Sequence, residues 1–393
     1  MYSDIYYIFS SITFLQIYIP LVIEATKRGF NNFFILRSNS KDYADPFSKN
    51  HINILQKFTK TYNIKTIDSS QININQLKGI IILIDGDIYG PPRNELINQS
   101  LLRKFNRKNT IICSFTEHQN FGDKYRFIEP YVDFLFFENK KLIDYWSSFK
   151  SKDYIGKPLK VYHSNKNIYN INPKYDNIDF NTNIDSIYQH FKLPKKHKYC
   201  LFLYPKTAQL DINQPGFEES DIFNIYSHLH KLNYKIIVKL RPKTSEFINQ
   251  KLTGDYFVQS DTYPNETLLL LRIVDLCITS SSSASSECLF TSVPCIDLET
   301  NILHSRKQWP PYKYLLDNKF YKQITNTQWR GISFPHFKHL LLSIESKNSK
   351  YISNLRHSYF PKKKSSKLFF DFLQTTLKNR NILRKQKKRL KKL

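Results

Sequence analysis

The sequence predicts an α/β protein of two domains, each built on a doubly wound parallel sheet with helices on both faces. The chain has 393 residues, a length that accommodates two domains. Short apolar runs alternate with longer segments of helical periodicity, which is the pattern of parallel strands joined by helices. Residues 154–198, rich in Asn, Asp, Lys and Tyr, interrupt the alternation, which then resumes. We expect an N-terminal domain at 1–165, a second domain at 166–345, and C-terminal helices with a basic tail at 346–393.

The first half opens with an apolar run, and Ser10-Ser11 can cap the helix that follows. The apolar stretch 5–23 also invites interpretation as a signal peptide or membrane anchor. No basic residue precedes it and polar residues interrupt it, so we interpret it as a strand followed by a helix. In this domain we expect strands at 4–9, 33–36, 79–84, 110–114 and 133–137, and helices at 12–27, 51–62, 95–105 and 140–149.

The second half repeats the alternation. We expect strands at 199–205, 234–240, 276–278 and 295–298, and helices at 218–232, 267–272, 335–343 and 352–357. Beyond them, a helical stripe of apolar residues is expected to pack on the body of the protein. The stripe consists of Leu368, Phe369, Phe372, Leu373 and Leu377.

The chain is organised around residues 275–298. A short apolar run ends at Ile278, and a dense group of serines precedes a helical pattern that contains Glu287. The serines are Ser280, Ser281, Ser282, Ser283, Ser285 and Ser286. A helix N-terminus offers unpaired backbone N–H groups and partial positive charge, so small hydroxyl residues there suit a phosphate. Helix capping alone is the alternative interpretation, although one cap does not need six serines. Glu287, inside the helix, is placed to accept hydrogen bonds from two ribose hydroxyls.

This stretch resembles the C-terminal half of GT-B glycosyltransferases. It is most similar to the branch of CDP-glycerol glycerophosphotransferases and capsule or surface polysaccharide transferases. The resemblance rests on Asp275 before the strand, the serines at 281–283, Glu287 in the helix, and Val293-Pro294 before the next strand. It implies two Rossmann-like domains facing a cleft, with terminal helices that cross back to the first domain. Epimerases that act on nucleotide sugars share this fold and turn.

The strand at 234–240 runs into Arg241, Pro242 and Lys243. Many GT-B relatives have Lys-x-His-Pro here, with the His on the donor phosphates. Because an arginine can donate two hydrogen bonds to a phosphate, the resemblance implies that Arg241 still binds the donor. An acid–base role does not carry over, and a solvated basic turn is the alternative. The expected donor-phosphate ligands are Arg241, Lys243, Ser280, Ser281, Ser282, Ser283 and Ser285, and Glu287 is the expected ribose ligand.

In the first domain, the strand at 110–114 leads into Glu117 and His118. GT-B relatives place a His at this strand end that is thought to deprotonate the acceptor hydroxyl, although the glycine that follows it there is absent here. A His of near-neutral pKa suits proton abstraction, so His118 is the expected general base. Glu117 is a second candidate or its orienting partner. An ordinary loop histidine is the alternative.

Asp85-Gly86-Asp87 spells the metal-binding pattern of the other large transferase architecture. The same three residues are ordinary turn chemistry, which we favour here. GT-B enzymes generally stabilise the leaving diphosphate with helix dipoles and basic residues. We therefore expect no metal and no cofactor, with a nucleotide-activated sugar as co-substrate.

The net charge is +26, and residues 362–393 alone hold ten lysines, three arginines and one aspartate, or +12. Such a tail suits an anionic membrane surface; nucleic acid, or a solvated end, is the alternative. The five cysteines are odd in number and mostly lie in apolar runs, which indicates free thiols in a reducing compartment. We therefore expect a cytoplasmic protein, with peripheral membrane attachment as a further option.

These observations together predict a metal-independent glycosyltransferase of the GT-B type. It would move a sugar, or an alditol phosphate, from a nucleotide-activated donor to a hydroxyl of a surface or lipid-linked glycan. The first alternative is a nucleotide-sugar 2-epimerase, although that family usually has a Ser-Gly-Gly turn and this turn lacks glycine. The second is a non-catalytic protein of the same fold that binds membrane or nucleic acid through its basic tail.

Overall fold

The computed structural model divides the chain into two compact units, each described here by itself. Unit 1 comprises Met1–Asn177 and Tyr359–Leu393, and unit 2 comprises Ile178–Ser358. The structure describes residues 3–8, 14–36, 49–68, 71–84, 105–106, 108–115, 132–138, 140, 143, 168–178, 183–203, 219–240, 253–258, 266–280, 284–298, 319–324 and 326–378. The helices expected at 95–105 and 140–149 lie almost wholly outside these residues.

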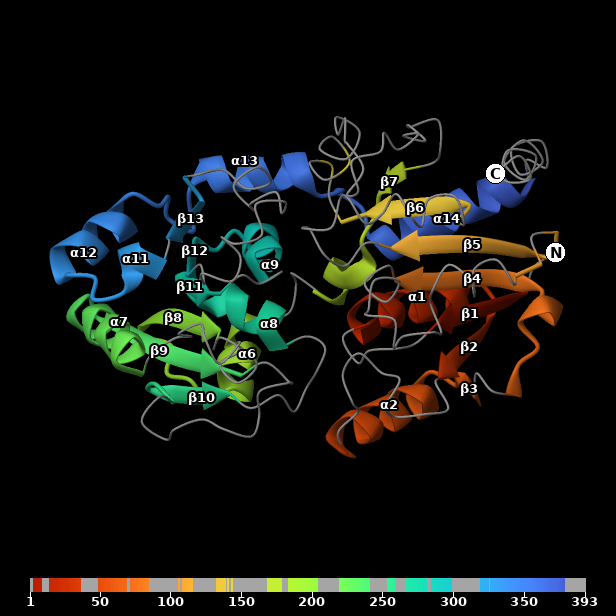
Figure 1. The fold of residues 1–393 in the computed structure, drawn as a ribbon, viewed down its shortest axis with the longest axis horizontal. Coiled ribbons are helices and arrows are strands. Elements are labelled where there is room, and N and C mark those ends of the chain that lie inside the picture. The colour runs from red at the N-terminus through yellow and green to blue at the C-terminus, as the bar shows by residue number, and fades with distance from the viewer. Residues whose placement is uncertain are drawn as a thin grey trace. The chain divides into compact units, whose positions relative to one another are not determined.

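Unit 1 contains a seven-stranded parallel sheet in the order β3-β2-β1-β4-β5-β6-β7 (Figure 1). The strands are β1 (Asp4–Ile8), β2 (Asn31–Leu36), β3 (Lys65–Asp68), β4 (Gly79–Ile84), β5 (Thr110–Phe115), β6 (Phe134–Phe137) and β7 (Ile168–Asn170). The helical elements are α1 (Leu15–Lys27), α2 (Lys49–Thr61), the 3₁₀ turns η4 (Ile74–Gln76) and η8 (Pro173–Asn177), and α14 (Ser365–Lys378). Strands β4 and β5 are buried along their whole length, as expected for central strands of a parallel sheet.

Unit 2 contains a six-stranded parallel sheet in the order β10-β9-β8-β11-β12-β13. The strands are β8 (Lys198–Leu203), β9 (Tyr234–Lys239), β10 (Tyr256–Val258), β11 (Leu276–Thr279), β12 (Cys295–Leu298) and β13 (Tyr321–Ile324). The helices are α6 (Ile184–His190), α7 (Glu219–Lys231), α8 (Glu266–Ile273), α9 (Ala284–Thr291), α11 (Asn326–Trp329), α12 (Phe334–Leu342) and α13 (Lys350–Tyr359). In both units the first strand lies inside the sheet, with the second and third strands added on one side of it and the later strands on the other. This is the strand order of a doubly wound Rossmann-like sheet.

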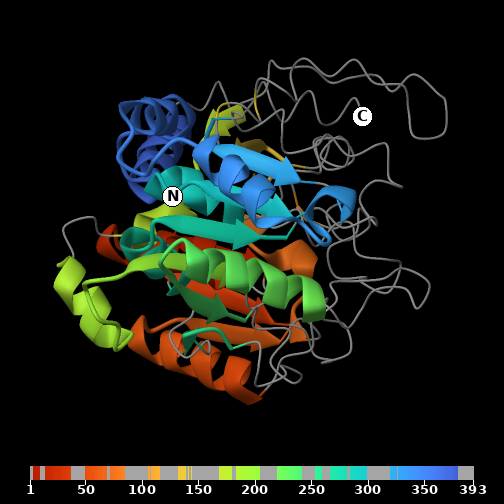
Figure 2. The same cartoon turned by 90° about the vertical axis from the view of Figure 1, so that its left-hand side faces the viewer.

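The two faces of the sheet in unit 2 carry different side chains. Alternate residues of the strands, among them Phe202, Val238 and Ile278, pack with α7 and α12 in an apolar cluster. Figure 2 shows α7, in green, running alongside these strands. Because side chains of a strand alternate between faces, Lys239, Thr279 and Asp297 lie on the opposite face. Helices α8 and α9 cover that face, since Glu266 of α8 pairs with Lys239 and α9 contacts β11 and β12.

Aspartates at the amino ends of the strands fasten neighbouring strands together. Asp275 stands immediately before β11 and accepts the backbone N–H of Tyr199 in β8, at 3.0 Å. Asp255, before β10, accepts the N–H of Ile236 in β9 at 2.8 Å. Asp133, before β6 of unit 1, accepts the N–H of Ile112 in β5 at 2.9 Å. Asp275 matches the family motif, and its carboxylate binds the backbone of the adjacent strand at the amino edge of the sheet.

The expected boundary at residue 165 differs from the division in the structure. Strand β7 pairs in parallel with β6, so the chain leaves unit 1 only after η8, at Asn177. The chain also returns to unit 1 at Tyr359, and α14 packs on α1 and η8. Of the apolar stripe expected in the C-terminal region, Phe369 and Leu373 are buried in α14 and the other three residues are partly buried. Phe369 packs against Phe115 and Phe136, and Phe372 against Phe134.

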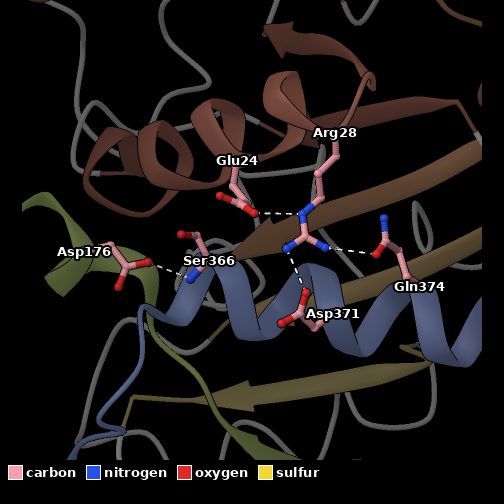
Figure 3. A network of polar contacts seen from close by, with 6 residues as sticks. All are labelled: Glu24, Arg28, Asp176, Ser366, Asp371 and Gln374. Atoms are coloured by element: carbon pink, nitrogen blue, oxygen red, sulfur yellow. Dashed lines mark hydrogen bonds and ion pairs between the residues drawn. The ribbon is translucent and has the colours of Figure 1, made fainter.

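A polar network fixes α14 beside α1 (Figure 3). The Arg28 guanidinium at the end of α1 donates to Glu24 at 2.7 Å, to Asp371 at 2.8 Å and to Gln374 at 3.1 Å. Asp176 of η8 accepts the backbone N–H groups of Ser365 and Ser366, at 2.8 and 2.6 Å. These are orphan donors of the first helical turn, so Asp176 supplies the N-terminal cap of α14 from a distant part of the chain.

We expect Asp176→Ala to cost about 1–2 kcal/mol of stability, because it leaves two buried N–H groups without their acceptor. Asp371→Ala serves as the control, since Asp371 is half exposed and its ion pair with Arg28 is worth under about 1 kcal/mol. Urea unfolding gives the free energies, and amide hydrogen exchange reports on α14 directly. An Asp176→Ala variant no less stable than Asp371→Ala would contradict the capping role.

Candidate functional site

The candidate site lies at the carboxyl edge of the sheet in unit 2. Strand β11 ends at Thr279, Ser280 follows, and α9 begins at Ala284, so the strand and the helix expected from the sequence are present. Ser281, Ser282 and Ser283, which the sequence analysis expects to bind phosphate, lie outside the described residues. Ser280 is 8% exposed, whereas Ser285, in the first turn of α9, has no exposed surface. Glu287 also lies in the first turn of α9 and is buried.

The topology of the sheet singles out this turn. Strands β8 and β11 are neighbours, but the strand order runs in opposite directions on their two sides. This arrangement is a topological switch point; in doubly wound sheets a crevice generally lies there, beyond the carboxyl ends of the strands. The serine turn after β11 begins at this point. Ligands of doubly wound sheets bind at such positions, so the fold and the serine motif indicate the same place.

A buried ion pair next to the turn was not anticipated from the sequence. The Lys239 ammonium, at the end of β9, lies 3.5 Å from Oε2 of Glu266 in the first turn of α8, and both side chains are buried. Burial lowers the pKa of Lys239, while the charges of Glu266 and Glu287 act in the opposite direction. Lys239 is therefore placed to interact with carboxylates on the first turns of both α8 and α9.

The sequence did hold a signal for Lys239. It is the lysine of the Lys-x-His-Pro pattern, two positions before Arg241, and it ends an otherwise apolar strand. A lysine is rarely buried unless it has a charged partner, so its place at a strand end would have been grounds to look for one. Glu266 carried no such signal, because an acidic residue in the first turn of a helix is common for capping and dipole reasons.

Two further polar residues lie at the same edge, in register across neighbouring strands. Thr279 of β11 and Asp297 of β12 are paired positions. Asp297 is fully buried and accepts a hydrogen bond from the Tyr321 hydroxyl of β13, at 2.5 Å. The Thr279 hydroxyl is also buried and has no hydrogen-bond partner among the described residues. Together with Lys239, Glu266 and Glu287, these residues form what we call the polar rim.

A group of thiols underlies the rim. All five cysteines are free and buried, as the sequence predicted. Cys277 and Cys295 are paired positions of β11 and β12, two residues before Thr279 and Asp297 along the strands. Cys288 of α9 lies close to both thiols. Burial raises the pKa of Cys277, but hydrogen bonds from Cys288 and Cys295 lower it below its ordinary value. Among the described residues, no group of His, Cys, Asp and Glu is arranged to hold a metal ion.

The remaining candidate residues fall outside the described part of the chain. They are Glu117, His118, Arg241, Lys243 and the carboxylates of Asp85 and Asp87. The strand leading to His118 is present as β5, and its Ser114 hydroxyl is buried with no hydrogen-bond partner in the described residues. At the end of the neighbouring strand β6, buried Glu138 accepts a hydrogen bond from the Tyr175 hydroxyl of η8. The roles of Glu117 and His118 remain predictions.

No protein-family model matches this sequence, and no curated protein is significantly similar to it. Solved structures are similar in fold. The wall teichoic acid polymerase TagF superimposes with a TM-score of 0.60 at 13% identity, over 96% of this chain and 90% of that one. The S. aureus protein MnaA, solved with UDP, gives 0.58 at 13% identity, over 96% and 97% of the two chains.

A third similar structure is UDP-GlcNAc 2-epimerase from Neisseria meningitidis bound to UDP-GlcNAc, with a TM-score of 0.57 at 12% identity over 95% of this chain and all of that one. The chain has the GT-B fold. The expected architecture of two Rossmann-like domains is thereby confirmed. No helix in the described part of the chain is long and apolar enough to cross a membrane.

Proposed function

We propose that this protein is a GT-B glycosyltransferase. It moves a sugar, or an alditol phosphate, from a nucleotide-activated donor to a hydroxyl of a surface or lipid-linked glycan. The observation that carries the proposal is the position of Glu287, a buried carboxylate on the first turn of α9, directly after the turn at the switch point of unit 2.

This position suits a nucleotide for physical reasons. The N-terminal turn of α9 offers backbone N–H groups and a partial positive charge to phosphate oxygens. An ionised carboxylate only accepts hydrogen bonds, and its two oxygens match the paired hydroxyls of a ribose. Glu287 thus holds the ribose. Ser280, Ser281, Ser282 and Ser283 donate hydrogen bonds to the phosphates, and Arg241 and Lys243 neutralise their charge. The hydroxyl of Ser285 has no exposed surface, so it acts by supporting the turn.

The comparisons add support from proteins of the same fold. MnaA was solved with UDP, the N. meningitidis epimerase with UDP-GlcNAc, and a variant of TagF, at a TM-score of 0.54, after soaking with CDPG. In this chain, the proposal assigns the nucleotide to unit 2 and the acceptor to unit 1. His118 accepts the proton of the acceptor hydroxyl, with Glu117 as its partner or substitute, and helix dipole and basic residues stabilise the leaving group without a metal.

The test is thermal stabilisation of the full chain by UDP, GDP, CDP, ADP and CMP. A nucleotide present at about 100 times its Kd should add about 2.7 kcal/mol to the stability of the folded protein. We expect one of the five to stabilise the wild type and to lose its effect in Glu287→Ala. Glu345→Ala is the matched control, because Glu345 lies in unit 2 beside Lys319, at the amino end of β13, and should leave the effect unchanged. Stabilisation by none of the five nucleotides would refute the proposal.

A nucleotide-sugar 2-epimerase is the second candidate. It is favoured by the similarity to the N. meningitidis epimerase, which extends over the whole of that chain. Epimerisation at C2 needs no acceptor but must break a carbon–hydrogen bond. Incubating the protein with UDP-GlcNAc in D₂O, with no acceptor present, distinguishes the two reactions. We expect no deuterium at C2 by mass spectrometry or NMR; incorporation would favour the epimerase.

The proposal also gives the basic tail a role, which is to hold the enzyme at an anionic membrane surface near its acceptor. Each basic residue near such a surface contributes about 1 kcal/mol. Because α14 is an integral part of unit 1, the tail is best removed after Lys378 rather than at residue 362. We expect deletion of 379–393 to abolish binding to vesicles containing phosphatidylserine and to preserve nucleotide binding. If the wild type does not bind the vesicles, and the deletion instead abolishes binding to nucleic acid, the non-catalytic alternative is favoured.

A further inference from the structure

Thr279 carries a buried hydroxyl that the fold leaves without a hydrogen bond. It is the last residue of β11, and it is 1% exposed. The hydroxyl makes no hydrogen bond to any group in the part of the chain that the structure describes. Such a group lowers the stability of a folded protein, and native structures contain few of them. The exception at Thr279 therefore needs a reason that the free protein does not supply.

The strands on either side of β11 do not bind this hydroxyl. Asp297 holds the paired position on β12, but its carboxyl accepts the Tyr321 hydroxyl and is not bonded to Thr279. On the other side, β8 ends in the apolar Leu203. The partner of the Thr279 hydroxyl has to come from beyond the sheet.

Helix α9 covers the face of β11 on which Thr279 lies. Strands β11 and β12 are parallel, so α9, which joins them, has to run back from the carboxyl edge of the sheet to the amino edge. Cys288 of α9 lies close to Cys277, which shares a face with Thr279 because side chains alternate along a strand.

These positions place Thr279 beside the N-terminal turn of α9. From Cys288 back to Ala284, the first residue of the helix, is about 6 Å along the helix axis. From Cys277 forward to Thr279 is about 6.6 Å along the strand. The two steps run in the same direction and have nearly the same length, so both lead to the same level of the fold.

We propose that Thr279 binds the donor nucleotide, its hydroxyl donating a hydrogen bond to a phosphate oxygen at the N-terminal turn of α9. The free N–H groups and partial positive charge of that turn attract an anion, and phosphate oxygens accept the hydrogen bond that the hydroxyl lacks. The inference rests on the proposed function, since it concerns the same site. It adds a ligand from the strand itself to those expected in the turn.

The proposal implies that Thr279 lowers the stability of the free protein and raises its affinity for the nucleotide. Thr279→Val tests this, because valine keeps the branched shape and removes only the hydroxyl. Calorimetry on the full chain gives the Kd, with whichever of UDP, GDP, CDP, ADP and CMP stabilises the wild type most. We expect the Kd of Thr279→Val to rise at least about tenfold, since a hydrogen bond to a charged group is lost. Thr279→Ser keeps the hydroxyl and should retain most of the affinity.

Urea unfolding without nucleotide supplies the second measurement. Thr279→Val should unfold at the same urea concentration as the wild type or a higher one, because no hydrogen bond is lost in the free protein. Thr110→Val is the matched control: Thr110 is also buried on a parallel strand, but its hydroxyl donates to the carbonyl of Asn106 at 2.9 Å. The control should unfold at a lower urea concentration and bind the nucleotide as the wild type does.

Every result bears on the inference. An unchanged Kd for Thr279→Val would overturn it. A lower unfolding midpoint for this variant, or failure to fold, would show that the hydroxyl has a partner in the free protein, such as Asp297, and would overturn it too. Equal loss of affinity in Thr279→Ser would assign the effect to packing of the methyl group. A wild type that binds none of the five nucleotides would instead refute the proposed function, and this inference with it.

Discussion

The alternation of side chains along the parallel strands of unit 2 is the constraint on which the site depends. Both faces of the sheet are covered by helices, so most strand positions have to be apolar. Polar side chains are tolerated at the last residue of a strand, where the edge opens onto the turns. Lys239, Thr279 and Asp297 occupy that last layer, or the position next to it, on the face covered by α8 and α9. The parallel register then brings residues from separate strands into one rim.

Polar residues at the two edges of the sheets serve different purposes. At the amino edge, Asp133, Asp255 and Asp275 each accept a backbone N–H from the adjacent strand, so their carboxylates are committed to the fold. At the carboxyl edge, Glu266 pairs with Lys239, Asp297 accepts a hydrogen bond from Tyr321, and Glu287 is buried in the first turn of α9. Acidic residues thus stabilise strand pairing at one edge, and at the other they lie where ligands of doubly wound sheets generally bind.

The sequence was sufficient to predict those helices and strands that have a clear apolar periodicity of their own. The apolar runs of β4 and β5, and the strand and helix on either side of the serines, are where periodicity placed them. Strands β3, β7, β10 and β13 were not expected, because three or four residues at the margins of a sheet show little periodicity. The pair of Lys239 and Glu266 joins residues of β9 and α8, and only the packing of the two elements reveals such a contact. The division in the structure falls after Asn177, beyond the expected boundary at residue 165, because the last strand of unit 1, β7, is short and follows a polar segment.

The course of the chain through unit 1 has a consequence for its synthesis. Helix α14 covers the face of β5 and β6 that presents Phe115, Phe134 and Phe136, yet it is made after the whole of unit 2. A chain emerging from the ribosome therefore carries an uncovered aromatic surface on unit 1 while unit 2, continuous in sequence, completes its own fold. Such a surface is a target for chaperones during translation. A product that ends between residues 358 and 365 would contain all of unit 2 but lack α14, so unit 1 would still expose part of its core.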